Sequence, residues 1–414
     1  MRTILKGGVV VNLDGGPSTQ QDLVIEGEQI ASVGGAAAAN GDKVVDVSGM
    51  YLLPGLVNCH VHLGWDGSHD LQMQANESPA INALKAIMNI HRHLSAGVTT
   101  IRDLGMNEAN IDAKIAVDNG WAPWIRLFPN GRAICTTGGH TWWCCREADG
   151  IYGVRKAVRE QFKAGASWIK IMGSHEEVQF TMDELRAMVE EAHQNGMMVT
   201  AHATFNEAIS RVVDAGVDCV EHGGSMTPET IDKLVEKGVP IVTTFSPLVQ
   251  QVKFGLDFGM SVSDVERRKD QMAEKSRFAG NVAAARAGVP IVFGTDAGSP
   301  VVPHYAIAEE LKFMVDIGVC PDNLDALNSI TRRGIKLLGL EDELGSLEAG
   351  RTADVVAVGG DPLASLDHMK DVKRVFVRGQ MAFSSEGGYT QVGRDVEGIG
   401  TRWGPGAEIG YRRA

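Results

Sequence analysis

The sequence lacks several features that would indicate a particular class of protein. No two of its six cysteines are separated by two residues, so they indicate neither a structural zinc site nor a disulfide framework. No apolar segment approaches the roughly 20 residues that a membrane span needs. The apolar stretch at the N-terminus is short and interrupted by glycines, which favours a strand over a signal peptide. We therefore expect a soluble cytoplasmic protein.

A run of basic residues is missing as well. The chain has 39 Lys and Arg against 52 Asp and Glu, which gives a formal charge of −13 spread along its length. This balance argues against nucleic acid and anionic membrane surfaces as partners. The expected partner is a small-molecule substrate, and a homo-oligomer is the expected assembly.

The two ends of the chain have the pattern of β-structure, and the middle alternates strands with helices. Residues 1–53 and 345–414 contain short alternating runs bounded by Gly, Pro and Asp turns. Residues 54–344 contain apolar runs that are each followed by a segment of helical periodicity. Eight such units predict an α/β fold, a (β/α)8 TIM barrel. The two β-rich ends are expected to pair into one small composite β-sandwich domain.

Six residues with side chains suited to a metal site lie at or near the ends of the predicted barrel strands. They are His60, His62, Lys170, His202, His222 and Asp296. The carboxyl ends of barrel strands meet on one rim, so these side chains are expected to lie together. Imidazole and carboxylate are ligands that a hydrolytic metal site requires. The set therefore predicts a metal-assisted hydrolase.

Each of these residues also has a simpler interpretation. His60 and His62 point to one face of a strand, because strand side chains alternate, and could be two hydrogen-bonded residues in a turn. Lys170 lies inside an apolar strand, where a buried ammonium is costly. Its amine could have a lowered pKa, could react with CO2 to form a carbamate, or could extend to the rim of the barrel. His202 and His222 could each be a hydrogen-bonded histidine of the core, and Asp296 could cap a helix.

The motifs resemble those of the amidohydrolase superfamily, in its binuclear metal branch. The segments PGLVNCHVH, SWIKI, TAHA, EHGG and FGTDAG occur in this order, one for each expected strand. The resemblance extends to SAGVTTIRDLG and to LGSLEAGRTADVVAV, so it covers nearly the whole chain. It implies a barrel enzyme with two divalent metal ions.

The resemblance also implies a role for each candidate ligand. His60 and His62 would bind one metal ion, and His202 and His222 the other. Carbamylated Lys170 would bridge the two ions, and Asp296 would be a ligand and the general base. A hydroxide that bridges the metals would then attack the carbonyl of an amide bond. Zinc is the expected metal, although Mn, Fe or Co suit the same nitrogen and oxygen ligands.

The substrate is indicated by a loop after the third strand. The sequence is similar to Xaa-Pro dipeptidases and to carboxypeptidase-like members, which share the TGGH segment that ends at His140, and it also resembles imidazolonepropionase-related members. His140 could contact a substrate carboxylate or the scissile carbonyl, or it could be a surface histidine. Trp142 and Trp143 follow it and favour a bulky apolar group. His304 near the last strand could support the site or begin a helix.

Two departures from the family pattern widen the choice of substrate. The aromatic segment Trp142–Cys145 replaces a smaller stretch, and no tyrosine follows His222. We expect hydrolysis of an N-acyl amino acid or of an Xaa-Pro or Xaa-hydrophobic dipeptide. The alternatives are a cyclic amide, or an aromatic carbamate, urea or anilide. A deaminase or a non-catalytic barrel fits less well, because all six ligands are present. Residues 246–278 could cover the substrate or belong to the core.

Overall fold

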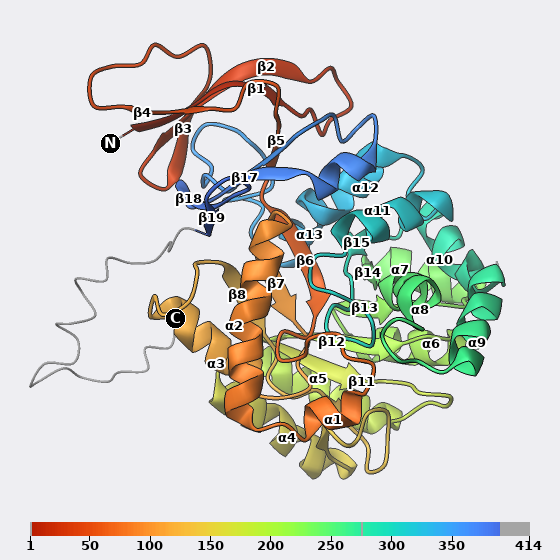
Figure 1. Cartoon of the computed structure of the whole chain (residues 1–414). Coiled ribbons are helices and arrows are strands. Elements are labelled where there is room, and N and C mark those ends of the chain that lie inside the picture. Colours follow the sequence, from red (N-terminus) through yellow and green to blue (C-terminus); the bar gives the residue numbers. More distant parts are fainter. Residues whose placement is uncertain (1, 275, 390–414) are drawn as a thin grey trace, which may run out of the picture.

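The strands of the barrel follow the order that the sequence predicts. The computed structural model describes residues 2–274 and 276–389, and shows a barrel beside a smaller β-rich part (Figure 1). The eight parallel strands are β6 (Leu56–Val61), β7 (Val98–Asp103), β8 (Arg126–Pro129), β11 (Trp168–Met172), β12 (Met198–Ala203), β13 (Cys219–His222), β14 (Ile241–Thr243) and β15 (Ile291–Phe293). Two short strands extend the sheet beyond β11: β9 (Ile134–Cys135) pairs with β11, and β10 (Arg146–Glu147) pairs with β9. The predicted α/β barrel is confirmed.

Backbone hydrogen bonds join the barrel where regular strand pairing is interrupted. The Ser167 N–H donates to the carbonyl of Pro129 at 2.7 Å, which connects β8 with β11. The Asp296 N–H donates to the carbonyl of His60 at 2.9 Å, which connects the end of β15 with β6. Closure of the barrel therefore places two of the predicted site residues side by side.

Helices surround the strands on the outside of the barrel (Figure 1). They are α1 (Leu71–Ala75), α2 (Pro79–Ser95), α3 (Ala109–Asp118), α4 (Gly150–Ala164), α5 (Met182–Gln194), α6 (Asn206–Ala215), α7 (Pro228–Lys237), α8 (Ser246–Phe254), α9 (Val262–Ala273), α10 (Ser276–Arg286), α11 (Ile307–Asp316), α12 (Asn323–Ile330), α13 (Arg332–Leu337) and the 3-10 helix η1 (Leu366–Lys370). Local sequence determines where several of these helices begin and end. Thr181 and Glu184 form a capping box that begins α5, and α4 ends at Gly165 in the left-handed conformation. Within the described ranges, no helix is both long enough and apolar enough to span a membrane.

Nine strands from the two ends of the chain form one sheet, which we call the terminal sheet. They are β1 (Arg2–Val10), β2 (Thr19–Glu26), β3 (Gln29–Gly34), β4 (Lys43–Asp46), β5 (Tyr51–Pro54), β16 (Val355–Val358), β17 (Val372–Val377), β18 (Gln380–Ser384) and β19 (Gly388–Tyr389). In β5, Leu52 pairs with Val10 on one side and with Ala357 on the other, so both chain ends meet there. The boundaries 1–53, 54–344 and 345–414 stay predictions, and residues 390–414 lie outside the described residues.

The chain passes directly from the terminal sheet into the barrel at Gly55. The segment PGLVNCHVH, expected to form the first barrel strand, is divided here, because Pro54 ends β5 and β6 begins at Leu56. A Cβ at Gly55 would lie 2.1 Å from Oγ1 of Thr99 in β7, so only glycine fits. The close approach keeps the start of β6 packed against the start of β7.

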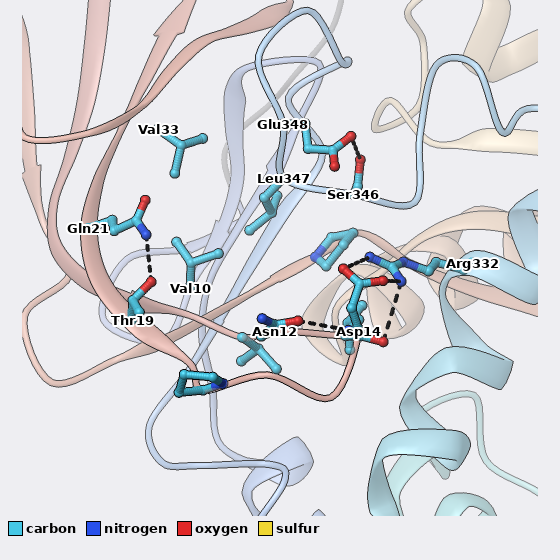
Figure 2. A pocket seen from close by; sticks show the side chains of 14 residues that line it. Val10, Asn12, Asp14, Thr19, Gln21, Val33, Arg332, Ser346, Leu347 and Glu348 are labelled. Carbon is cyan, nitrogen blue, oxygen red and sulfur yellow. Dashed lines mark hydrogen bonds and ion pairs between the residues drawn. The ribbon is translucent and has the colours of Figure 1, made fainter.

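A buried ion pair and a cavity lie where the terminal sheet meets the barrel. Arg126 of β8 forms an ion pair with Asp354, whose side chain is 1% exposed and also accepts a hydrogen bond from the Arg378 N–H at 2.9 Å. A separate cavity of about 240 Å³ lies between β1 and α13, where Asp14 pairs with Arg332 (Figure 2). None of the six predicted site residues lines this cavity, so it is not the predicted site.

Replacing Asp354 by Asn should lower the free energy of unfolding by about 3 kcal/mol, because Arg126 would stay buried without its counter-charge. Urea unfolding followed by circular dichroism measures this. Asp14→Asn is the matched control, since its side chain is 73% exposed and such pairs contribute at most about 1 kcal/mol. Equal losses in the two variants would contradict a structural role for the buried pair.

Candidate active site

Two histidines and one aspartate converge where the barrel closes. His60 and His62 lie at the end of β6, and Asp296 lies three residues after the end of β15. Oδ1 of Asp296 lies 2.9 Å from Nε2 of His62 and 3.5 Å from Nε2 of His60. One ligand atom from each of the three residues lies within 4.8 Å of the other two, a spacing suited to a metal ion.

Each of the two histidines forms a hydrogen bond through Nδ1, the ring nitrogen that does not face Asp296, and this bond determines whether Nε2 can bind a metal ion. Nδ1 of His60 lies 2.6 Å from a carboxylate oxygen of Glu221, and Nδ1 of His62 lies 3.3 Å from the carbonyl oxygen of Gly105. Both oxygens are acceptors, so both Nδ1 atoms donate. In the neutral rings the two Nε2 lone pairs then face Asp296. Three acceptors that converge without a proton between them fit a bound cation.

The remaining predicted ligands lie next to this cluster. The ring centroid of His222, at the end of β13, is 4.8 Å from that of His60 and 4.5 Å from that of His202 in β12. Lys170 in β11 is 1% exposed and pairs in register with Thr200 of β12. The structure therefore brings together the ends of β6, β12 and β13 and the segment after β15, with Lys170 buried in β11 beside β12, and the roles of these residues as metal ligands stay predictions.

Burial keeps the imidazoles neutral, which leaves their lone pairs available to a metal. Burial, and to a smaller extent the positive charge of Lys170, lowers the pKa of His60. Burial likewise lowers the pKa of His202 and of His222. Burial also lowers the pKa of Lys170 itself, although the carboxylates of Glu221 and Asp296 oppose this effect.

Two of these residues have a strained backbone. His222 has φ of 70° and Asp296 has φ of 58°, in the left-handed region that residues other than glycine rarely adopt. His222 is the last residue of β13 and Asp296 lies three residues after β15, so in both places the positive φ turns the chain out of the strand direction. Such strain concentrates at functional sites, where the surrounding structure maintains it.

The predicted substrate loop touches both ends of the histidine cluster. The ring of His140 lies 4.5 Å from that of His202. Three residues later, Trp143 stacks at 5.9 Å on Trp65, which in turn lies 5.6 Å from His62. The loop therefore spans the cluster from the His202 side to the His62 side. Trp142 is 52% exposed and belongs to the outer surface of this loop.

Residues outside the loop hold it in this position. The side-chain oxygen of Gln179 accepts hydrogen bonds from the His140 N–H at 3.0 Å and from the Thr136 hydroxyl at 3.1 Å. The guanidinium of Arg132 donates to the carbonyl oxygen of Cys144 at 3.0 Å. His175, to which the sequence assigned no role, has its ring 4.8 Å from that of His140.

The side chains of His304 and Arg146 are occupied by other partners. His304 is 1% exposed, donates from Nε2 to the carbonyl oxygen of Trp65 at 2.7 Å and packs its ring on His93. It supports the segment that carries Trp65, and its contact with substrate stays a prediction. Arg146 pairs with Glu160 at 2.6 Å, so its guanidinium already has a carboxylate partner.

The segment 246–278 is largely helical, with α8, α9 and the start of α10. The carboxylate of Glu310 in α11 accepts from the Phe245 N–H at 2.8 Å and from the Ser246 hydroxyl at 2.6 Å, which fixes the beginning of α8. Leu256 and Phe258, between α8 and α9, are more than half exposed. The role of the segment in covering a substrate stays a prediction.

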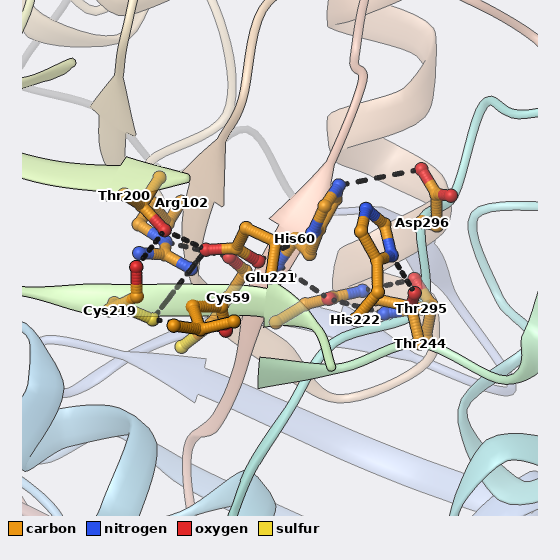
Figure 3. A network of polar contacts seen from close by, with 12 residues as sticks. Cys59, His60, Arg102, Thr200, Cys219, Glu221, His222, Thr244, Thr295 and Asp296 are labelled. Atoms are coloured by element: carbon orange, nitrogen blue, oxygen red, sulfur yellow. Dashed lines mark hydrogen bonds and ion pairs between the residues drawn. The ribbon is translucent and has the colours of Figure 1, made fainter. Parts of the chain in front are cut away.

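The residues that form hydrogen bonds with the candidate ligands, or with their partners, were not predicted from the sequence. Glu221 contacts His60, Arg102 contacts Glu221, and the Thr244 hydroxyl lies 2.6 Å from Nδ1 of His222 (Figure 3). Arg102 and Glu221 are charged residues near the ends of apolar strands, the same signal that identified Lys170. The sequence could therefore have identified Arg102 and Glu221 as candidates, but it could not show which residues they contact.

Comparisons with known proteins agree with this geometry. The ochratoxinase of Aspergillus niger is 28% identical over 90% of this chain and 84% of its own length. A prolidase structure in complex with N-methylphosphonate-L-proline superposes with a TM-score of 0.83 at 29% identity, covering 93% of this chain and 100% of that one. A Xaa-Pro dipeptidase structure with bound methionine gives 0.82 at 29% identity, covering 92% and 99%. The model of the amidohydrolase family matches residues 51–382, and the chain belongs to this family.

Proposed function

We propose that this protein hydrolyses the amide bond of N-acyl amino acids or of Xaa-Pro and Xaa-hydrophobic dipeptides. As a member of the amidohydrolase family it is a metal-dependent hydrolase that acts on C–N bonds of small molecules. The observation that carries the proposal is the convergence of His60, His62 and Asp296 beside His202 and His222, with His140 next to them. The similarity to a prolidase and to a Xaa-Pro dipeptidase supports the substrate class.

The ligand set suits two divalent ions, with zinc as the expected metal. His60 and His62 would hold one ion, and His202 and His222 the other. When bound, the ions would polarise the substrate carbonyl and activate water.

Lys170 would bridge the two ions as a carbamate. Its burial lowers the pKa of the amine, which favours the neutral form that reacts with CO2. The reaction forms a bond between Nζ and the carbon of CO2 and releases one proton. The product is a carboxylate, and two nearby cations would stabilise its negative charge in this water-poor site.

Asp296 would accept the proton of the attacking water. Burial alone would raise the pKa of its carboxyl group, whereas the hydrogen bond from the Ser299 hydroxyl lowers it, and adjacent divalent cations would lower it further. The carboxylate is therefore ionised at neutral pH. The Ser299 hydroxyl donates to Oδ1 at 2.8 Å and helps to fix its orientation.

His140 would recognise the substrate by a hydrogen bond from a neutral ring. Burial, with a smaller contribution from His175, lowers its pKa to about 4. A neutral imidazole can donate to a carboxylate or to a carbonyl oxygen. The pairing of Arg146 with Glu160 removes the competing candidate for a carboxylate anchor in this loop.

The stacked Trp65 and Trp143 favour a second candidate, a hydrolase of cyclic amides or of aromatic carbamates, ureas or anilides. The two indoles lie 5.9 Å apart with their planes inclined by 19°, beside His62. Aromatic surfaces of this kind pack well against flat apolar groups. The similarity to an ochratoxinase is compatible with this candidate and with the first.

A hydrolysis screen of the zinc-loaded enzyme distinguishes the two candidates. The panel contains N-acyl amino acids, Xaa-Pro and Xaa-hydrophobic dipeptides, and their α-amides, together with lactams, aromatic carbamates and anilides. We expect turnover of the substrates with a free α-carboxylate, and a raised KM for them in His140→Ala. Turnover restricted to uncharged aromatic amides or carbamates would contradict the peptidase proposal and support the second candidate.

Replacing Lys170 by Ala should reduce turnover to background and lower the metal content of the purified protein, because the bridging ligand is lost. Elemental analysis and the same hydrolysis assay measure both effects. Asp296→Asn is the comparison: it should retain most of the metal but lower kcat by about 10²- to 10⁴-fold, as expected for loss of a general base. Two bound metals and normal turnover in Lys170→Ala would exclude the bridging role.

A further inference from the structure

A fully buried ion pair lies directly behind His60. Arg102 of β7 and Glu221 of β13 are both 0% exposed. Nη2 of Arg102 donates to Oε1 of Glu221 at 2.5 Å, and the Thr200 hydroxyl donates to the same oxygen. The other oxygen, Oε2, accepts from Nδ1 of His60 at 2.6 Å. Figure 3 shows the carboxylate between the guanidinium and the imidazole.

The guanidinium is itself held on several sides. Nε of Arg102 donates to the carbonyl oxygen of Cys59 at 2.7 Å, and the guanidinium carbon lies 4.7 Å from the ring centroid of Trp168. Arginine keeps its charge under all ordinary conditions. Glu221 therefore faces a permanent positive charge, and its ionised carboxylate can only accept hydrogen bonds.

This arrangement connects distant parts of the barrel. His60 and Arg102 belong to the neighbouring strands β6 and β7, whereas Thr200 and Glu221 belong to β12 and β13. The hydrogen bonds cross the interior between these two pairs of strands (Figure 3). The orientation of the His60 ring thus depends on residues from the other side of the barrel.

We propose that Glu221, held by Arg102, is a positioning residue that fixes His60 with Nδ1 protonated and with the Nε2 lone pair directed to a divalent cation beside Asp296. The inference rests on the proposed metal site. It assigns a role to Glu221 and Arg102, which are not among the proposed metal ligands. Carboxylates that orient metal-binding imidazoles contribute about 10- to 100-fold to metal affinity. Arg102 keeps the carboxylate in place, so that Glu221 holds the ring and does not turn toward the metal.

The first test observes the tautomer without metal and without substrate. Long-range 1H–15N spectra of the full chain, labelled with 15N-histidine and freed of metal, report which ring nitrogen of His60 carries the proton. A His60→Gln variant assigns the signal. We expect Nδ1–H and a bare Nε2. A His60 ring with the proton on Nε2 would overturn the inference.

The second test measures zinc affinity by competition with a chromogenic chelator. Glu221→Gln should bind zinc about 10- to 100-fold more weakly than the unaltered protein. Because it leaves Arg102 without a counter-charge, the double variant Arg102→Met/Glu221→Gln is measured as well. We expect the double variant to unfold at a higher temperature than Glu221→Gln while its zinc affinity stays low. Zinc affinity within twofold of the unaltered protein in either folded variant would overturn the inference.

Asp354→Asn serves as the matched control, because it removes one partner of another buried arginine–carboxylate pair, far from His60 in the barrel. It should lower the unfolding temperature and leave zinc affinity unchanged. If Asp354→Asn weakened zinc binding as much as Glu221→Gln does, the effect would be one of stability and the inference would fall. If the tautomer and the affinity change as expected but no amide in the panel is hydrolysed, the proposed function falls and the positioning role stands.

Discussion

Water is largely excluded from the interior of this barrel at the end where its strands carry ionisable side chains, and every such side chain must be compensated there. An uncompensated charge in such a place costs several kcal/mol. Arg102 and Glu221 compensate each other, and the carboxylate of Asp296 accepts a hydrogen bond from the Ser299 hydroxyl. The same exclusion keeps the histidines neutral. The site is thus organised by electrostatic compensation, and the positions of its strands follow from closure of the barrel.

Much of the fold and most of the candidate ligands could be predicted because they depend on local sequence. The alternation of apolar runs with helical segments identifies the barrel, and the position of a histidine or aspartate at the end of a run places it on the rim. His60, His202 and Asp296 are brought together in this way. The division of the first predicted strand at Gly55 escaped this reasoning, because it depends on the close approach of Thr99.

The partners of these residues could not be predicted, because they depend on the three-dimensional arrangement. Glu221 lies 161 residues after His60 in the chain, and no local pattern connects them. The contacts of the loop that carries His140 and Trp143 likewise depend on the three-dimensional arrangement. His140 and Trp143 are three residues apart, yet they meet opposite sides of the histidine cluster, His202 and Trp65 respectively. A displacement of this one loop would therefore alter both sides of the substrate space together.

The sharing of β5 between the two ends of the chain sets an order of events during biosynthesis. Leu52 pairs with Ala357, so β5 keeps one open edge until the ribosome has released β16. By then all eight barrel strands have emerged. Pairings between such distant residues form slowly, and an open strand edge can pair with another chain in the meantime. The nascent protein is thus most exposed to aggregation in the interval before its last strands are translated, and a chaperone that shields β5 would act in that interval.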